Sequence, residues 1–236
     1  MGRLTGMMVE LKASEMDIRE NVELLRQAME ALSGASEIPM AQAKVPSGDS
    51  PALFSMGEDI PAVAEIEGII ISAQYRNAYW DKPMDDGRGA PVCSSTDGKS
   101  GWYLEDGEPM ERSCHTCPYN RMGNAPGGKK GKACKNMARL LMLTDSSVLP
   151  VEIKVPTMSV NNLTAYVAHA LVPRRLTINQ VTTKLKLFKT ANARGTKYYQ
   201  IQFECTGRAD DEQVNALLDA AQPLLLNTGE ETKKDE

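Results

Sequence analysis

The chain has 236 residues, of which 42% are hydrophobic and 25% charged, a composition typical of a globular protein long enough to bury a core. No stretch approaches about 18 consecutive apolar residues, and the first residues lack the apolar region of a signal peptide, so we expect neither a membrane span nor a secretory leader. Without a span or a leader, we expect a cytoplasmic protein that does not contact membranes. The formal net charge of −4 excludes a chain that is basic throughout.

The first predicted element is an amphipathic helix within residues 1–33. Ser14 and Asp17 resemble a capping box, and Gly34 is expected to end the helix. One face carries an apolar stripe, too short for an independent coiled coil, formed by Ile18, Val22, Leu25, Met29 and Leu32. We expect this stripe to dock on its own domain, with self-association as the alternative.

Residues 34–60 are rich in Ser, Pro, Gly and Ala and are predicted to form a flexible linker to a main domain at 61–226. In that domain, Ile69–Ile71 predict a strand. Residues 81–131, with nine glycines and five prolines, predict little regular structure, and "GKACKNMARLLML" predicts a short helix.

The second half of the main domain is more regular. "VLPVEIKVP" predicts a strand, and "SVNNLTAYVAHAL" predicts a helix that is capped by Ser159 and ends near Pro173. A β-hairpin is predicted over residues 177–207, turning through residues 191–195, and a last helix over residues 210–226. The acidic tail of residues 227–236 is expected to be disordered.

Four of the five cysteines are grouped in the middle of the chain. Cys114 and Cys117 form a C-x2-C pair, Cys93 lies 21 residues before it and Cys134 17 residues after it, while Cys205 stands apart. Disulfides are rare in reducing compartments, and four thiolates at this spacing suit a tetrahedral structural zinc ion. Zinc would then replace the missing apolar core of an insertion spanning residues 81–139.

Other interpretations of the cysteines remain open. The "CPYN" run is also compatible with an iron–sulfur cluster, His115 is a conceivable substitute ligand, and the thiols could be buried without any metal. Four sulfur ligands leave no open position for catalysis, and neither His115 nor His169 has an orienting partner for a cysteine nucleophile. The basic segment has no acidic cluster for magnesium, so we do not expect an enzyme.

The charges are segregated along the sequence. Residues 1–111 carry 9 basic and 20 acidic side chains (−11), residues 112–197 carry 15 and 2 (+13), and residues 198–236 carry 3 and 9 (−6). A central block with so few acids indicates binding to a polyanion. On the predicted helix, Lys132, Lys135 and Arg139 share one face, directly after Lys129 and Lys130. The N-terminus of such a helix favours phosphate, although some of these cations would also balance the charge of a four-thiolate zinc site.

Aromatic residues accompany the basic ones. Trp102 and Tyr119 are predicted to stack on bases near the cysteine loop, with Arg121 on the same surface, or else to cover the metal. In the predicted hairpin, period-two alternation places Phe188 on the side of the lysines, although it could instead lie under a loop. The hairpin residues predicted to contact nucleic acid are Lys184, Lys186, Phe188, Arg194, Lys197 and Tyr198.

The chain resembles the zinc-containing, OB-fold single-stranded-DNA-binding proteins of tailed bacteriophages. The resemblance spans roughly residues 62–226 and rests on "CHTCPYN", "GKKGKACKN", "LPVEIKVPTMS", "YYQIQFECTG" and the acidic C-terminus. It implies a metal subdomain inserted into an oligonucleotide-binding barrel, with Cys93, Cys114, Cys117 and Cys134 as ligands. It also implies strand contacts by the groups at residues 129–139 and 184–198.

We therefore expect a mixed α/β (α+β) protein with an OB-like β-barrel core, an inserted four-cysteine zinc loop and flanking helices. Its expected function is sequence-tolerant binding of single-stranded DNA in phage DNA replication or recombination, in the host cytoplasm, with protein partners reached through the acidic tail. The alternative is a zinc-containing transcription regulator that binds duplex DNA or host RNA polymerase.

Overall fold

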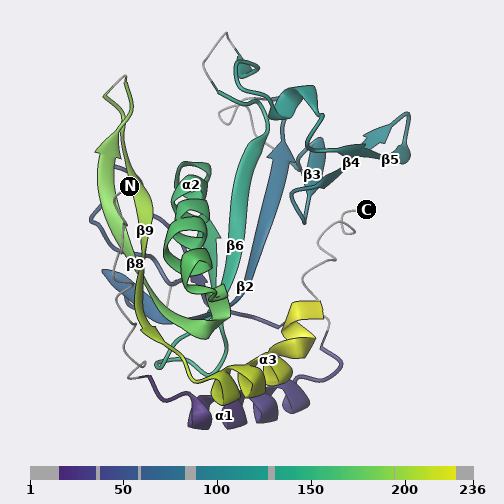
Figure 1. Cartoon of the computed structure of the whole chain (residues 1–236). Coiled ribbons are helices and arrows are strands. Elements are labelled where there is room, and N and C mark those ends of the chain that lie inside the picture. Colours follow the sequence, from purple (N-terminus) through teal and green to yellow (C-terminus); the bar gives the residue numbers. More distant parts are fainter. Residues whose placement is uncertain are drawn as a thin grey trace, which may run out of the picture.

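The structure, a computed structural model, combines one large sheet with three α-helices (Figure 1). It describes residues 16–35, 38–57, 60–82, 89–126, 131–193 and 195–226. Several predicted features lie outside the described residues: the Ser14 cap, Lys129, Lys130, Arg194 and the tail at 227–236. The mixed α+β class is confirmed. None of the described helices has the length and apolar character needed to cross a membrane.

Within the described residues, nine strands form a single open sheet, and the strand pairing therefore does not establish the predicted barrel. The strands are β1 (Gln42–Ala43), β2 (Glu65–Tyr79), β3 (Cys93–Ser95), β4 (Ser100–Glu105), β5 (Glu108–Ser113), β6 (Lys135–Leu143), β7 (Val151–Val155), β8 (Val181–Ala191) and β9 (Lys197–Arg208). Their spatial order is β1-β7-β6-β2-β3-β4-β5, and the β8–β9 hairpin joins β2. The pair β1–β7 is parallel and the other pairs are antiparallel.

The long strand β2 carries two ribbons on one of its edges. Its first edge pairs with β6 through residues 69–78. Its second edge pairs with β8 through residues 65–69 and with β3 through residues 77–79, so the two ribbons leave β2 at opposite ends. A register shift between Ile70 and Ser72 marks a β-bulge.

Residues 135–143 form strand β6, so the predicted helix is wrong. Side chains of β6 alternate between two cores: Leu140 and Met142 face α2 (Thr157–Ala165), whereas Leu141 and Leu143 face α1 (Arg19–Ala31) and α3 (Asp211–Leu226). A strand covered on both faces is apolar throughout, and such a run has no period that separates it from a buried helix. Cys134 therefore precedes a strand and gains nothing from a helix dipole.

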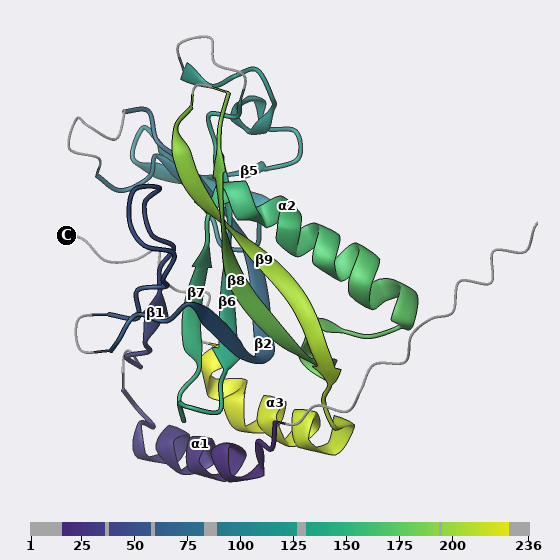
Figure 2. The same ribbon diagram turned by 90° about the vertical axis from the view of Figure 1, so that its left-hand side faces the viewer.

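Helices α1 and α3 lie side by side across one end of the sheet (Figures 1 and 2). The predicted stripe of α1 is buried there, with Leu25 fully inaccessible and packed in one cluster with Leu217 of α3. The stripe thus docks on its own domain, as predicted, and the helix itself begins at Arg19.

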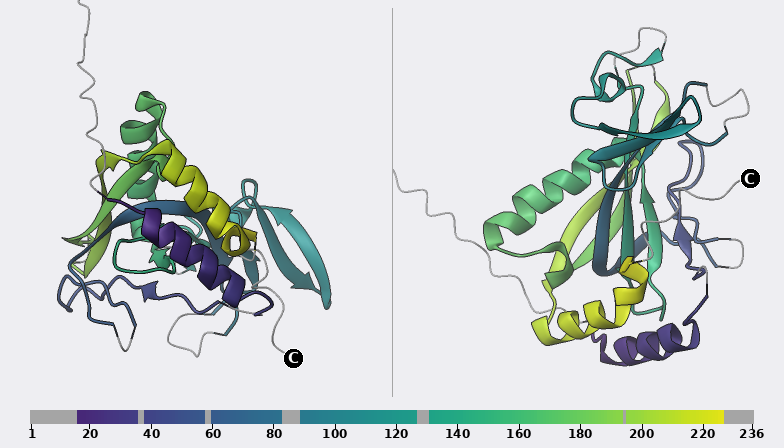
Figure 3. Two further views of the ribbon diagram at one scale, coloured as in Figure 1. Left: turned by 90° about the horizontal axis from the view of Figure 1, so that it is seen from below. Right: turned by 90° about the vertical axis from the view of Figure 1, so that its right-hand side faces the viewer.

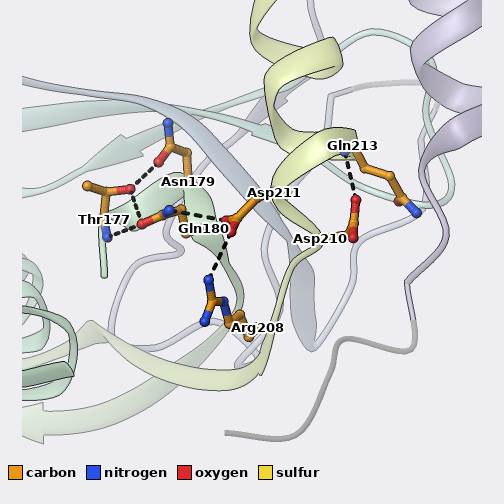
Figure 4. Close-up of polar contacts among 7 residues, drawn as sticks. All are labelled: Thr177, Asn179, Gln180, Arg208, Asp210, Asp211 and Gln213. Carbon is orange, nitrogen blue, oxygen red and sulfur yellow. Dashed lines mark hydrogen bonds and ion pairs between the residues drawn. The ribbon is translucent and has the colours of Figure 1, made fainter. Parts of the chain in front are cut away.

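A polar cluster holds the start of α3 against the hairpin (Figure 4). The Asp210 carboxylate accepts a hydrogen bond from the backbone N–H of Gln213 at 3.0 Å, as the side chain of an N-cap residue does. The Asp211 carboxylate accepts a hydrogen bond from the Gln180 side chain at 3.2 Å and pairs with Arg208 at 2.9 Å. These contacts connect α3 to the end of β9 and to the 3-10 turn at Ile178–Gln180, which precedes β8.

The linker prediction is wrong for residues 38–57, which pack along the sheet. Strand β1 pairs with β7, and Phe54 is completely buried in the core that faces α2. Gly48 lies against the backbone of Lys197, where an added Cβ would come 1.9 Å from the carbonyl oxygen. The small residues of this segment serve close packing rather than chain freedom.

The predicted hairpin is confirmed as β8–β9, and the predicted strands around Ile69–Ile71 and in "VLPVEIKVP" are confirmed as β2 and β7. Helix α2 starts two residues before the predicted cap. Ser159 is instead fully buried, and its hydroxyl accepts a hydrogen bond from the Ile201 amide of β9 at 2.9 Å. Residues 81–131 are more regular than predicted, because they contain β3, β4, β5 and a 3-10 turn at Pro118–Asn120.

Candidate metal centre and nucleic-acid interface

The four grouped cysteines line one pocket. Cys93 begins β3, Cys114 follows β5, Cys117 precedes the 3-10 turn and Cys134 precedes β6, so four separate elements meet there. The last three thiols are buried and that of Cys93 is half-buried. Cys205 lies elsewhere, on β9 beside Tyr166, as expected for a core thiol.

Gly101 of β4 makes this convergence possible. An added Cβ at this position would lie 3.0 Å from the Cys93 sulfur and 3.5 Å from the Cys114 sulfur. Any side chain here would therefore occupy the space beside two of the four thiols. The glycine is needed for close approach and not for an unusual backbone angle.

The thiols influence one another electrostatically. Burial, together with the neighbouring Cys114, Cys117 and Cys93, raises the pKa of Cys134 to about 11, while Lys132 opposes the effect. Burial likewise raises the pKa of Cys93, with Cys114 and Cys117 adding to the shift. A cation among the sulfurs would relieve this repulsion between thiolates.

A polar network ties the cysteine loop to the sheet. Asn120 donates to the Cys114 carbonyl at 2.9 Å and accepts from Asn136 of β6 at 3.0 Å. Asn136 also donates to Asn77 of β2, and Lys132 donates to Asn136 at 2.7 Å and to Asn120 at 3.1 Å. Lys132, predicted to contact nucleic acid, is therefore engaged inside the protein.

The donor set fits a thiophilic metal. The pocket is lined by four cysteines and by no Asp, Glu or His among the described residues, which suits zinc or an iron–sulfur cluster rather than magnesium or calcium. Within the described ranges, however, no three such side chains are already drawn together in metal-ligand geometry. His115 is exposed and does not line the pocket, so nothing favours it as a substitute ligand.

Two predicted stacking residues differ in their surroundings. Tyr119 lines the cysteine pocket and stacks on Tyr79, with ring centroids 4.2 Å apart and planes 13° apart, so one of its faces is already covered. Trp102 is 50% exposed on β4, directly across from Glu111 of β5. Arg121 is exposed next to the 3-10 turn, where its guanidinium reaches the Thr116 carbonyl at 3.5 Å.

The predicted row of cations after the cysteine loop does not form a shared surface. Arg139 is buried and donates two hydrogen bonds to Glu152 of β7, at 2.8 and 2.9 Å. Lys135 lies half-buried at the start of β6. The row depended on a helix; in the structure Lys132 lies before β6, and only Lys135 and Arg139 belong to that strand.

On the hairpin, the predicted alternation is correct but the base of the ribbon is not positive. Lys184 forms ion pairs with Glu67 at 2.9 Å and Glu65 at 3.3 Å, and these contacts raise its pKa. Lys186 pairs with Glu204 at 2.9 Å. The acids come from neighbouring strands, so the lysines near β2 are largely neutralised.

The outer half of the hairpin is different. Phe188 is 51% exposed and lies on the same face as Tyr198, because the pairs Phe188–Gln200 and Thr190–Tyr198 are two positions apart along the ribbon. Phe188 therefore does not lie under a loop. Residues 187–203 contain Lys189, Arg194 and Lys197 and no acid.

Sequence reasoning missed several residues of this region. Gly101 has no signal of its own, because its role depends on sulfurs from distant segments. Arg112 lies with its guanidinium 4.1 Å from the Tyr103 ring centroid, and contacts with Tyr103 and Cys117 raise its pKa. Tyr75, 40% exposed on β2, meets Thr164 of α2 at 3.1 Å. Its period-two position in "SAQYRNAY" was the available signal.

The hairpin tip and the cysteine loop lie at the same end of the molecule, opposite α1 and α3 (Figures 1 and 2). No protein-family model, curated protein or solved structure matches this chain.

Proposed function

We propose that the protein binds single-stranded DNA without strong sequence preference, as phage replication and recombination proteins do. The strand would cross the end of the molecule that carries the hairpin tip and the cysteine loop. Lysines and arginines neutralise phosphates and release counterions, while exposed aromatic rings accept bases.

One observation carries the proposal: Phe188 is half exposed in a stretch that has three cations and no acid. A large aromatic side chain at an exposed position of a strand gains nothing from the core, and here Tyr198 lies diagonally across from it on the same face. Two rings on one face of the ribbon form the kind of platform on which successive bases stack, while Lys189, which lies over the Tyr199 ring, and Lys197 add positive charge from the opposite face.

The interface we propose is smaller than the sequence indicated. Its described members are Phe188, Lys189, Lys197 and Tyr198, with Tyr119 and Arg121 on the cysteine loop. Lys129, Lys130 and Arg194 lie outside the described residues and add positive charge to the sequence of the same two segments. Arg139, Lys132 and Lys184 are left out because Glu152, the asparagine network and Glu65 with Glu67 engage them.

A structural zinc ion is part of the proposal, with Cys93, Cys114, Cys117 and Cys134 as its ligands. Bound there, zinc would cross-link four segments that share little apolar core. Three features of the chain would support the ion. Gly101 leaves space beside two of the sulfurs, the asparagine network holds the loop on the sheet, and Arg112 and Lys132 place positive charge near the thiols. An iron–sulfur cluster is the alternative occupant.

An OB-like barrel is also part of the proposal. The β8–β9 ribbon and β7 lie at the two sides of the core that faces α2. The segment after β1 spans between them, because Ser47 forms an isolated β-bridge with Tyr198 while β1 pairs with β7. This bridge supports a barrel in which the segment after β1 closes the ring between β7 and β9.

The test is salt-titrated binding of a fluorescent oligo(dT) strand to the zinc-loaded protein. The three cations in the sequence of residues 187–203 predict a log–log salt slope of about −2 or steeper, at about 0.7 per phosphate contact. Replacing Phe188 with Ala should weaken binding about tenfold without changing this slope, because stacking is not ionic. Val172→Ala, at a 60% exposed position on the helix end away from the tip, is the matched control.

Two results would refute this function. A salt slope near zero would exclude a phosphate-dominated interface. Stronger binding to the matching duplex than to the single strand would favour the alternative, a zinc-containing regulator that acts on duplex DNA.

A further inference from the structure

The β4–β5 hairpin has an apolar face that is not covered. Figure 3 shows this hairpin projecting from the body of the protein. Trp102 is 50% exposed and Leu104 70% exposed, and both lie on one side of β4. Gly101 and Tyr103 lie on the other side, toward the cysteine pocket. Pro109, the cross-strand partner of Leu104, is also exposed.

No described part of the chain packs against this face. Neither Trp102 nor Leu104 belongs to any hydrophobic cluster formed by the described residues. Within the same ranges the Trp102 indole makes no hydrogen bond, although an indole N–H is usually partnered when it is covered. Strand β5 also lies at the end of the sheet, so the hairpin is accessible along one edge.

The surroundings of this face are strongly acidic. Residues 100–113 contain four acids and one base, and all four acids are exposed: Glu105, Asp106, Glu108 and Glu111. The base, Arg112, lies over the Tyr103 ring on the opposite side. Glu111 pairs directly with Trp102 across the strands. A nucleic acid strand would be repelled here, which argues against Trp102 as a base-stacking residue.

We propose that the Trp102–Leu104 face binds a segment of another protein that presents apolar side chains flanked by lysine or arginine. An apolar centre with a charged rim is the usual composition of a protein interface, and tryptophan is enriched among the residues that dominate binding. The negative rim selects a cationic partner through charge complementarity. This surface is separate from the proposed DNA interface and does not depend on it.

Trp102 itself provides the assay. The chain has two tryptophans, so Trp80→Phe leaves Trp102 as the only indole reporter. The probe is a nine-residue peptide of alternating Lys and Val, and its matched control has Glu in place of each Lys. The lysine peptide should produce a saturable blue shift of Trp102 emission, and the glutamate peptide should produce none.

Variants then locate the binding surface. Leu104→Ser should weaken the lysine peptide at least fivefold, and the pair Glu105→Lys with Glu108→Lys at least tenfold. The matched charge control is Glu20→Lys with Glu30→Lys, two exposed positions on α1, which should leave binding unchanged.

Three outcomes would overturn the proposal. The first is no shift, or an equal shift with both peptides. The second is a shift produced by oligo(dT), which would return Trp102 to the DNA interface. The third is a blue shift of Trp102 emission that appears without peptide as the protein concentration rises, together with a doubled molecular mass in sedimentation. This result would assign the face to a second copy of the chain.

Discussion

Replacing Gly101 with Ala tests the metal centre most directly. The added methyl group would lie 3.0 Å from the Cys93 sulfur, and relief to an ordinary contact of 3.4 Å requires that sulfur to move by about 0.4 Å. Metal–ligand distances are held within about 0.2 Å, so the displaced thiol would no longer complete the site. Perturbing the surroundings of metal ligands typically costs 10–100-fold in affinity, or about 1.4–2.8 kcal/mol.

Zinc affinity is measured by competition with a chromophoric chelator. Gly89→Ala is the matched control, because an added Cβ there has no neighbour within 4 Å and both glycines have ordinary backbone angles. We expect Gly101→Ala to bind zinc at least tenfold more weakly than Gly89→Ala. Equal affinity of the two variants would show that Cys93 and Cys114 do not share a metal beside Gly101.

Three further predictions test the pocket, the network and the packed N-terminal segment. The raised pKa of Cys134, about 11, keeps this thiol protonated at neutral pH, so zinc must displace its proton. The affinity for zinc should therefore fall as the pH falls from 8 to 6, and a constant affinity would contradict thiol ligation. Asn136→Ala removes the donor to Asn77 and Asn120 and should cost about 1–3 kcal/mol in the free energy of unfolding, measured with denaturant. The control Asn161→Ala, at an exposed position of α2, should cost less than about 0.5 kcal/mol. Phe54→Ala should cost about 3–5 kcal/mol if residues 38–57 are packed as described, whereas a loss below about 1 kcal/mol would restore the flexible linker.

The sequence predicted those parts of the fold whose local pattern agrees with their environment. The hairpin was readable because one face is buried and the other is not, so Leu185 and Ile201 alternate with polar residues. Strand β6 was not readable, because Leu140 and Leu141 enter different cores and leave no period. The packed segment at 38–57 was missed because its small residues are also those of flexible linkers.

The sequence indicated that the four cysteines are grouped, but it did not indicate which residues surround them. The spacing of the cysteines indicated four thiols in one place, and the structure brings them to one pocket. The charge pattern was less reliable, because segregation along the sequence is not segregation in space. Strand β2 belongs to the acidic block and pairs with β8 of the basic block, so Glu65 and Glu67 meet Lys184.

The bulge in β2 determines which residues reach the cysteine pocket. Before it, even-numbered side chains such as Ile66 and Ile70 enter the core that faces α2; after it, odd-numbered ones do, because Ala73 pairs with Leu140 of that core. Asn77 and Tyr79 line the pocket for this reason alone. If the same residues alternated regularly without the bulge, Arg76 and Ala78 would face the pocket instead, and the loop would lose both the tyrosine stack and the side-chain contacts of Asn77.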